Sequence, residues 1–135
     1  MIYLTRKEHF NAAHKLYNPL WSKEKNYQEY GDCSNENWHG HNYELIVTIK
    51  GIINNDDGMV INLKFLSQII NDEIISKVDH KNLNLDVPYF TNVIPSAENI
   101  CIYIYDILRN HIQKEFHLSV KLYETPRNFV EYSGN

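Results

Sequence analysis

The stretch that most constrains the fold is residues 33–43, because it ends in two closely spaced histidines and runs directly into a strand pattern. From Tyr43 to residue 51, apolar and often β-branched residues alternate with polar ones, which predicts a half-buried strand. Side chains two positions apart on a strand share a face, so His39 and His41 converge, with backbones roughly 6.5–7 Å apart. Two imidazoles in this arrangement can bind one metal ion if a third ligand arrives from elsewhere.

A second segment offers that third ligand. Residues 2–14 contain apolar residues in an extended pattern and end at His14, so we expect a strand that pairs with the first and brings His14 to the other two histidines. Three histidines with an open fourth position form the arrangement of a catalytic zinc ion. His9, His111 and His117 are weaker choices for the third ligand. The alternative is that the two histidines reflect strand composition alone and bind no metal.

Charge and composition exclude several classes of protein. The 135 residues predict a single domain spanning residues 1–135, and the net charge of −4 without a cluster of basic residues argues against nucleic-acid binding. No apolar run approaches the roughly 20 residues of a membrane span. Charges fill the positions where a signal peptide would be apolar, so we expect a cytoplasmic protein. Cys101 reads as a buried thiol, and a disulfide with Cys33, the only other cysteine, is not expected.

Turn, cap and periodicity signals predict the remaining elements. Residues 21–30 allow a short helix, residues 62–78 read as an amphipathic helix, and residues 96–116 as a second one. Residues 118–122 alternate as a strand, and residues 128–132 form a last strand paired with it as a hairpin. The order of two strands, two helices and two strands favours an α+β fold with both helices on one face of an antiparallel sheet. Such a sheet has open edges, which favours assembly with further copies.

Three further groups could take part in chemistry. Asp79 and His80 form an acid–histidine pair at a helix end, where a carboxylate can orient an imidazole as a general acid or base. Cys33 could act as a base or nucleophile if neighbouring charge lowers its pKa from about 8.5. Glu124, at the end of a strand, could bind a guanidine-like or aminopyrimidine group through two hydrogen bonds. For each group the alternative is an exposed polar side chain without a role.

Six segments, in order along nearly the whole chain, resemble the 6-pyruvoyltetrahydropterin synthase family. They are residues 10–16, 33–43, 78–83, 86–90, 96–99 and 123–125. The resemblance implies one pterin synthase domain of the tunnelling-fold type, with a four-stranded antiparallel sheet and two helices packed on one face. It also implies that three copies form a barrel, that two trimers stack as a homohexamer, and that the active sites lie between subunits.

The same resemblance implies roles for individual residues. Zn²⁺ would be held by three histidines, His14, His39 and His41. Cys33 would abstract a proton from the substrate, and Asp79 with His80 would form a second relay from a neighbouring subunit. Three residues would bind the pterin substrate or lie near it: Glu124, Ser96 and Glu98.

The reaction implied is the conversion of 7,8-dihydroneopterin triphosphate to 6-pyruvoyltetrahydropterin with elimination of triphosphate. One alternative is the related 6-carboxytetrahydropterin synthases of the queuosine pathway, which act on the same substrate. Those enzymes typically have three residues between the cysteine and the first histidine, whereas five separate Cys33 from His39 here. A further alternative is a zinc-stabilised pterin-binding protein without turnover. No glycine-rich dinucleotide motif is present, so no nicotinamide is expected.

Overall fold

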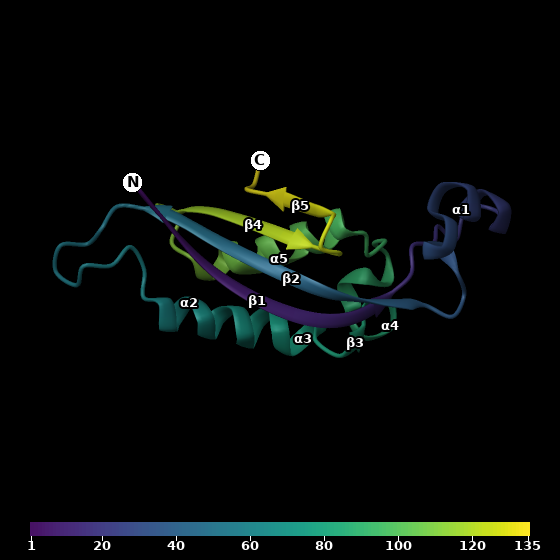
Figure 1. Ribbon diagram of the computed structural model, residues 1–135, viewed down its shortest axis with the longest axis horizontal. Helices are drawn as coiled ribbons and strands as arrows, with labels where there is room; N and C mark the ends of the chain where they lie inside the picture. The colour runs from purple at the N-terminus through teal and green to yellow at the C-terminus, as the bar shows by residue number, and fades with distance from the viewer.

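Two long strands form the centre of the fold in the computed structural model, which describes residues 1–135 (Figure 1). β1 (Ile2–His14) and β2 (His39–Gly51) have 13 residues each and pair antiparallel along their whole length. At one end of this pair His14 lies opposite His39. The register therefore brings both histidine-bearing segments to the same end of the sheet, as the sequence predicts.

The sheet has five strands in the order β3-β1-β2-β4-β5. It is therefore a mixed five-stranded sheet, whereas a four-stranded antiparallel sheet was expected. β4 (His117–Tyr123) and β5 (Phe129–Tyr132) are antiparallel to their neighbours, as expected. The additional strand, β3 (Lys81–Asn82), pairs parallel with the free edge of β1. It starts just after His80, whose backbone N–H donates to the carbonyl of Asn11. A strand of two residues has no alternation of side chains, so nothing in the sequence pattern reveals it.

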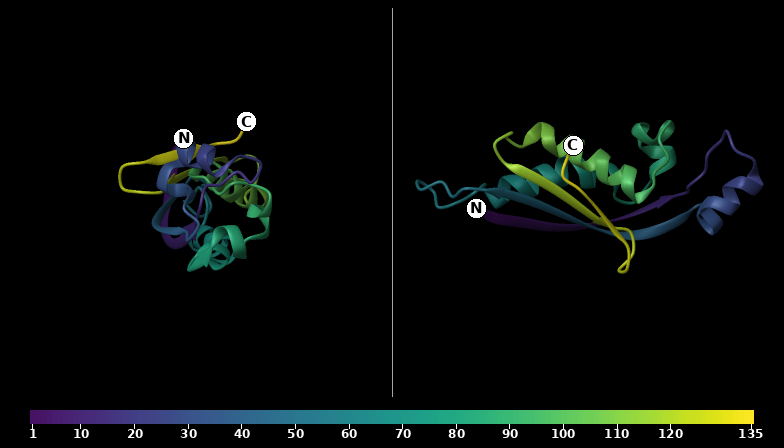
Figure 2. Two further views of the ribbon diagram at one scale, coloured as in Figure 1. Left: turned by 90° about the vertical axis from the view of Figure 1, so that its right-hand side faces the viewer. Right: turned by 90° about the horizontal axis from the view of Figure 1, so that it is seen from above.

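Two long helical segments cover one face of the sheet (Figure 2). The first consists of three consecutive parts: α2 (Leu63–Ile70), the π-helical turn η2 (Asn71–Ile75) and α3 (Ser76–Val78). The second is α5 (Ala97–His111), with Ser96 as its N-cap. It ends earlier than the expected residue 116, because Ile112 is extended and Arg109 donates to the carbonyls of the segment that follows. The α+β architecture with helices on one face is confirmed.

Short helical segments complete the chain. They are α1 (Lys23–Tyr30), η1 (Gly31–Ser34), α4 (Leu83–Asp86) and η3 (Pro88–Thr91). α1 lies beyond the histidine end of the β1–β2 pair, and the loop after β2 projects from the opposite end (Figure 1). Among all these helices, none combines the length and the apolar character that crossing a membrane would require.

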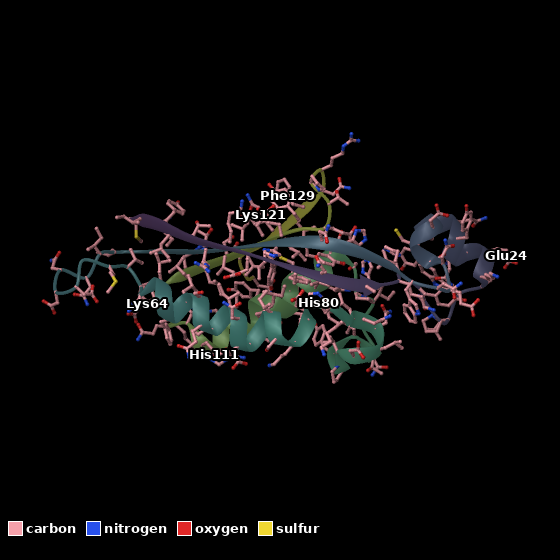
Figure 3. All side chains as sticks on the ribbon, turned by 60° about the horizontal axis from the view of Figure 1, so that its bottom comes forward. Glu24, Lys64, His80, His111, Lys121 and Phe129 are labelled. Atoms are coloured by element: carbon pink, nitrogen blue, oxygen red, sulfur yellow. The ribbon has the colours of Figure 1, made fainter.

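The core fills the space between the sheet and the helices. Alternate residues of β2 from Tyr43 to Ile49 are buried, and they face buried side chains of α2 and α5 such as Leu66 and Ile104. Burying an apolar side chain of this size contributes about 1.5–3 kcal/mol. The opposite face of the sheet is largely polar and is not covered, and Figure 3 shows Lys121 and Phe129 on that side. One buried face and one open face follow directly from the alternation seen in the sequence.

Candidate active site

Three imidazole rings meet at the end of the sheet, on the face that packs against the helices. The ring centres are 4.5 Å apart for His14 and His39, 5.0 Å for His14 and His41, and 4.9 Å for His39 and His41. One nitrogen from each ring can be chosen so that all three lie within 4.8 Å of one another. The structure therefore brings together the three histidines that the sequence indicates.

The orientation of His14 is fixed by groups behind it. Its side chain is only 1% exposed, and its Nδ1 donates to the carbonyl oxygen of Pro95 at 2.8 Å. This bond leaves Nε2 without a proton, because a neutral imidazole carries only one. The hydroxyl of Tyr43 lies 3.3 Å from the same Nδ1. A histidine whose second nitrogen is held by a backbone carbonyl is the usual arrangement of a metal ligand.

The electrostatics of the cluster fit a divalent cation. Burial lowers the pKa of His14 to about 4, and burial, followed by the neighbouring His41, lowers the pKa of His39. Both rings are therefore neutral near pH 7, which is the form that binds metal. Both ring nitrogens of His39 and Nε2 of His41 are buried without a hydrogen-bond partner. Unpaired buried polar atoms are costly, and a metal ion would satisfy Nε2 of His41 and one of the two nitrogens of His39; three imidazoles suit Zn²⁺.

Glu124 lies at the rim of the histidine cluster, just after β4. Its Oε2 lies 3.8 Å from Nε2 of His14, and its Oε1 lies 3.9 Å from Nε2 of His41. Both distances exceed the length of a hydrogen bond, and a neutral His14 makes no ion pair with the Glu124 carboxylate. A backbone hydrogen bond from Glu124 N–H to the carbonyl of Asn128 holds the turn in which the carboxylate sits. Glu124 thus presents two acceptor oxygens beside the three histidines.

Cys33 approaches the same region from η1. Its carbonyl accepts a hydrogen bond of 2.8 Å from the N–H of Leu16, two residues after His14. Burial raises the pKa of the Cys33 thiol, and the nearby carboxylates of Glu124 and Asp32 raise it further. The thiol therefore lies within electrostatic reach of Glu124, and it needs a nearby positive charge to be a thiolate at neutral pH.

Asp79 and His80 form the expected pair directly after the helical segment, and the pair does not contact the histidine cluster of its own chain. The Asp79 carboxylate accepts from the backbone N–H of Asn11 at 2.9 Å, and its other oxygen lies 3.0 Å from Nδ1 of His80. These contacts lower the pKa of Asp79, with the Asn11 N–H as the largest cause. The His80 side chain is 78% exposed (Figure 3) and makes no ion pair or hydrogen bond with the histidine cluster of its own chain. The pair lies at the edge of β1, facing outward.

The two remaining predicted site residues lie at the start of α5. The hydroxyl of Ser96 accepts from the N–H of Asn99 and caps the helix, directly after the Pro95 carbonyl that holds His14. Glu98 is exposed in the first turn of α5. A contact of either side chain with a bound pterin stays a prediction.

Tyr43 and the carbonyl of Pro95 were missed at the sequence level. Tyr43 shares the inward face with both β2 histidines, so the same alternation could have identified it. The Pro95 carbonyl is a backbone group 81 positions from His14, and no sequence pattern reveals it. The ammonium of Lys15, the residue after His14, lies 4.3 Å from the ring centre of Trp38. Trp38 has a positive φ of 67°, a strained backbone directly before His39.

Comparisons with known proteins agree with this geometry. A 6-pyruvoyl tetrahydrobiopterin synthase from Pongo abelii is 44% identical over 131 residues, which cover 97% of this chain and 90% of the relative. The solved structure of Caenorhabditis elegans 6-pyruvoyl tetrahydropterin synthase superimposes with a TM-score of 0.93 at 32% identity, covering 99% of this chain and 96% of that one. A 6-carboxy-5,6,7,8-tetrahydropterin synthase from Rickettsia bellii is less similar, at 28% identity over 97% of this chain and 99% of the relative.

The family model described as 6-pyruvoyl tetrahydropterin synthase matches residues 3–135. That span includes every element of the sheet except the first residue of β1, and all three histidines of the cluster. The chain belongs to the 6-pyruvoyl tetrahydropterin synthase family.

Proposed function

We propose that this chain is a lyase that converts 7,8-dihydroneopterin triphosphate to 6-pyruvoyltetrahydropterin and releases triphosphate. The observation that carries the proposal is the cluster of three histidines with unpaired buried nitrogens, with a carboxylate and a thiol beside it. It agrees with the names of the relatives, which are 6-pyruvoyl tetrahydrobiopterin synthases. That residues 1–135 act as one pterin synthase domain is part of this proposal.

The pyruvoyl product is favoured over the carboxy product. Sequence identity is 44% to a pyruvoyl synthase and 28% to a carboxy synthase. The five residues between Cys33 and His39 also match the pyruvoyl type expected from the sequence. A binding protein without turnover is disfavoured, because a thiol, an acceptor carboxylate and three candidate metal ligands occur together.

In the proposal, Zn²⁺ is held by His14, His39 and His41. The bound ion would supply Lewis acidity that makes the carbon next to a coordinated substrate hydroxyl more acidic. Within the chain, the Pro95 carbonyl keeps the proton of His14 on Nδ1 and so keeps Nε2 free. Both neutral rings, His14 and His39, bind without first losing a proton at pH 7.

Glu124 and Cys33 act on the substrate itself. The Glu124 carboxylate accepts hydrogen bonds from the amino and ring N–H groups of the pterin, which fixes the ring relative to the histidines. Cys33, as thiolate, removes a proton from the substrate side chain, and the electron pair left behind expels triphosphate. Without a cation nearby the pKa of Cys33 is raised, so this role depends on positive charge in the site.

Asp79 and His80 serve the active site of a neighbouring subunit. In one chain the pair points away from the histidines, at the open edge of β1. We therefore propose a homohexamer, a dimer of trimers in which the sheets form a barrel and adjacent chains complete each site. His80, oriented by Asp79, would donate and accept protons during the later transfers. The cytoplasmic location expected from the sequence stays a prediction.

The direct test incubates the zinc-loaded protein with 7,8-dihydroneopterin triphosphate, without added cofactor, followed by mass analysis. The expected result is a pyruvoyl pterin and free triphosphate, with Cys33→Ala slower by roughly 10²–10⁴-fold. A carboxy pterin would contradict the proposed product, and intact substrate would contradict the enzyme assignment.

A mixing experiment tests the shared site. Cys33→Ala and His80→Ala are each expected to be strongly impaired as pure proteins. When the two are unfolded together and refolded, some sites combine an intact Cys33 with an intact His80 from another chain, so activity returns. Separately refolded and then pooled variants are the control. No recovery in the mixed sample would contradict a site between subunits.

A further inference from the structure

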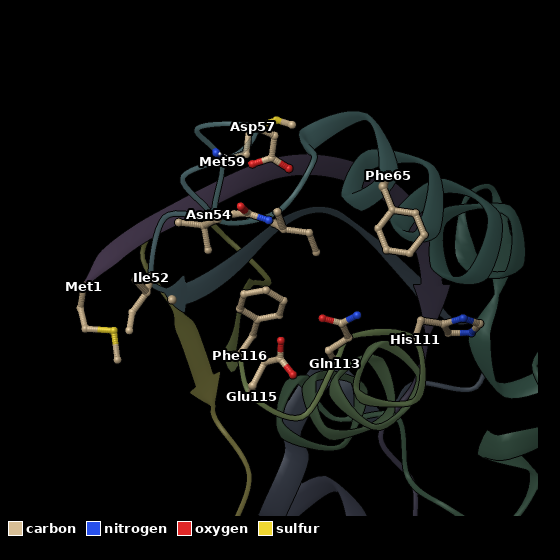
Figure 4. Close-up of a pocket in the computed structure, with 13 residues that line it drawn as sticks. Met1, Ile52, Asn54, Asp57, Met59, Phe65, His111, Gln113, Glu115 and Phe116 are labelled. Atoms are coloured by element: carbon tan, nitrogen blue, oxygen red, sulfur yellow. Dashed lines mark hydrogen bonds between the residues drawn. The ribbon is translucent and has the colours of Figure 1, made fainter.

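A second cavity lies at the end of the molecule opposite the histidine cluster (Figure 4). It has a volume of about 630 Å³ and lies between the end of β2, the loop that follows β2 and the segment after α5. His39 and Gly51 bound β2, so the two sites are separated by the length of this strand, roughly 40 Å. Small-molecule sites commonly have volumes of about 300–1,000 Å³. None of the groups proposed for catalysis lines this cavity.

Apolar side chains form most of its wall. Phe65 and Phe116 contribute two aromatic rings, and Met1 and Met59 contribute thioethers that adapt to aromatic ligands. A Cβ added to Gly51 would lie 2.8 Å from a Phe116 ring carbon, so this ring packs directly against the strand backbone and forms a floor. Phe65 lies in the first turn of α2 and is 48% exposed. A flat ring is therefore the shape that this wall accommodates.

Two carboxylates are the only acidic groups that line the cavity, and they lie among amides and one imidazole. Asp57 and Glu115 bring carboxylates, and Asn54 and Gln113 bring amides that both donate and accept; His111 and the amino-terminal residue Met1 also line the cavity, whereas no lysine or arginine does. Glu115 makes no ion pair, so its oxygens are available to a ligand. Figure 4 shows Glu115 and Gln113 beside the ring of Phe116. The two carboxylates disfavour phosphate and carboxylate groups and favour a ring that carries N–H donors.

We propose that this cavity binds an aminopyrimidine-type heteroaromatic ring without phosphate, separately from the active site. The ring would pack against Phe65 and Phe116, and its N–H edge would donate to Glu115. The carboxylates of Asp57 and Glu115 disfavour the triphosphate substrate. The site stands independently of the proposed reaction, because it uses neither the histidine cluster nor Glu124.

The two methionines of the chain make a direct test possible, because both line this cavity. The full-length protein labelled with ¹³C at the methionine methyl groups is titrated with unsubstituted pterin and followed by NMR. Both methyl signals should shift to saturation, and pterin-6-carboxylate should bind more weakly because of its charge. Glu124→Gln, which alters only the proposed active site, should leave these shifts unchanged.

Variants identify the groups responsible. Glu115→Gln should weaken pterin binding about tenfold or more, since it removes a charge-assisted hydrogen bond. Phe65→Ala, at a partly exposed position, should weaken it as well. Asp106→Asn, an exposed carboxylate on α5 away from the cavity, is the matched control and should change nothing. The proposal would be overturned if the methyl signals showed no saturable shift, or if Glu115→Gln bound pterin as well as the wild type. It would also be overturned if the signals shifted with protein concentration in the absence of pterin.

Discussion

Acid should destabilise the metal-free protein through His14. The imidazole is buried and its pKa in the folded chain is lowered to about 4, against an ordinary value of 6.5. Between these two pH values the unfolded chain binds a proton at this residue that the folded chain does not. The free energy of unfolding therefore falls as the pH drops from 6.5 to 4, and His14 causes no further change below 4.

The size of the effect follows from the gap between the two pKa values. A gap of roughly 2.5 pH units at about 1.4 kcal/mol per unit gives about 3.5 kcal/mol. This is a large part of the roughly 5–15 kcal/mol that stabilises a typical domain. His39 shifts in the same direction and should add to the loss, because burial lowers its pKa too.

The assay is urea unfolding of the chelator-treated protein at pH 7 and at pH 4.5. His14→Gln is the matched variant, since it lacks the titrating group but keeps His39 and the other acidic and basic residues. The wild type should lose about 2–3 kcal/mol more than the variant between the two pH values. Equal losses in the two proteins would refute the reasoning that burial keeps His14 neutral.

Three further substitutions test separate parts of the structure. Glu124→Gln should retain bound zinc in metal analysis, and its KM should show that it binds substrate about tenfold or more weakly. Loss of zinc would instead make Glu124 a metal ligand. Tyr43→Phe should lower zinc affinity about tenfold in a competition titration, because its hydroxyl lies 3.3 Å from His14; unchanged affinity would exclude a supporting role. Gly51→Ala should cost about 1–3 kcal/mol in urea unfolding, since its Cβ would lie 2.8 Å from Phe116 and Val60; an unchanged midpoint would mean that these side chains move aside.

Most of the site could be predicted from the sequence because its parts lie on regular strands. Alternation on β2 places His39 and His41 on one face, and pairing of β1 with β2 brings His14 opposite His39. Both steps need only the period of a strand and an antiparallel register. The groups that the sequence could not reveal, the Pro95 carbonyl above all, are contributed by contacts between distant segments.

The position of Asp79 illustrates a subtler limit. The buried residues Leu66, Ile70, Ile74 and Val78 follow one another at a constant spacing of four. In a regular α-helix each such step advances about 40° around the axis, so three steps would turn Val78 by about 120° away from the sheet.

The π-helical turn η2 offsets this drift. In it the N–H of Ser76 donates to the carbonyl of Asn71, five residues back, so the turn contains more residues than an α-helical one. Val78 consequently stays buried against the sheet, and Asp79 emerges beside the N–H of Asn11. The strict four-residue spacing was visible in the sequence, but a regular helix was expected from it. The location of the Asp79–His80 pair beside the edge of β1 thus depends on a local widening of the helix, and in the proposed oligomer this is the edge where the pair would meet a second chain.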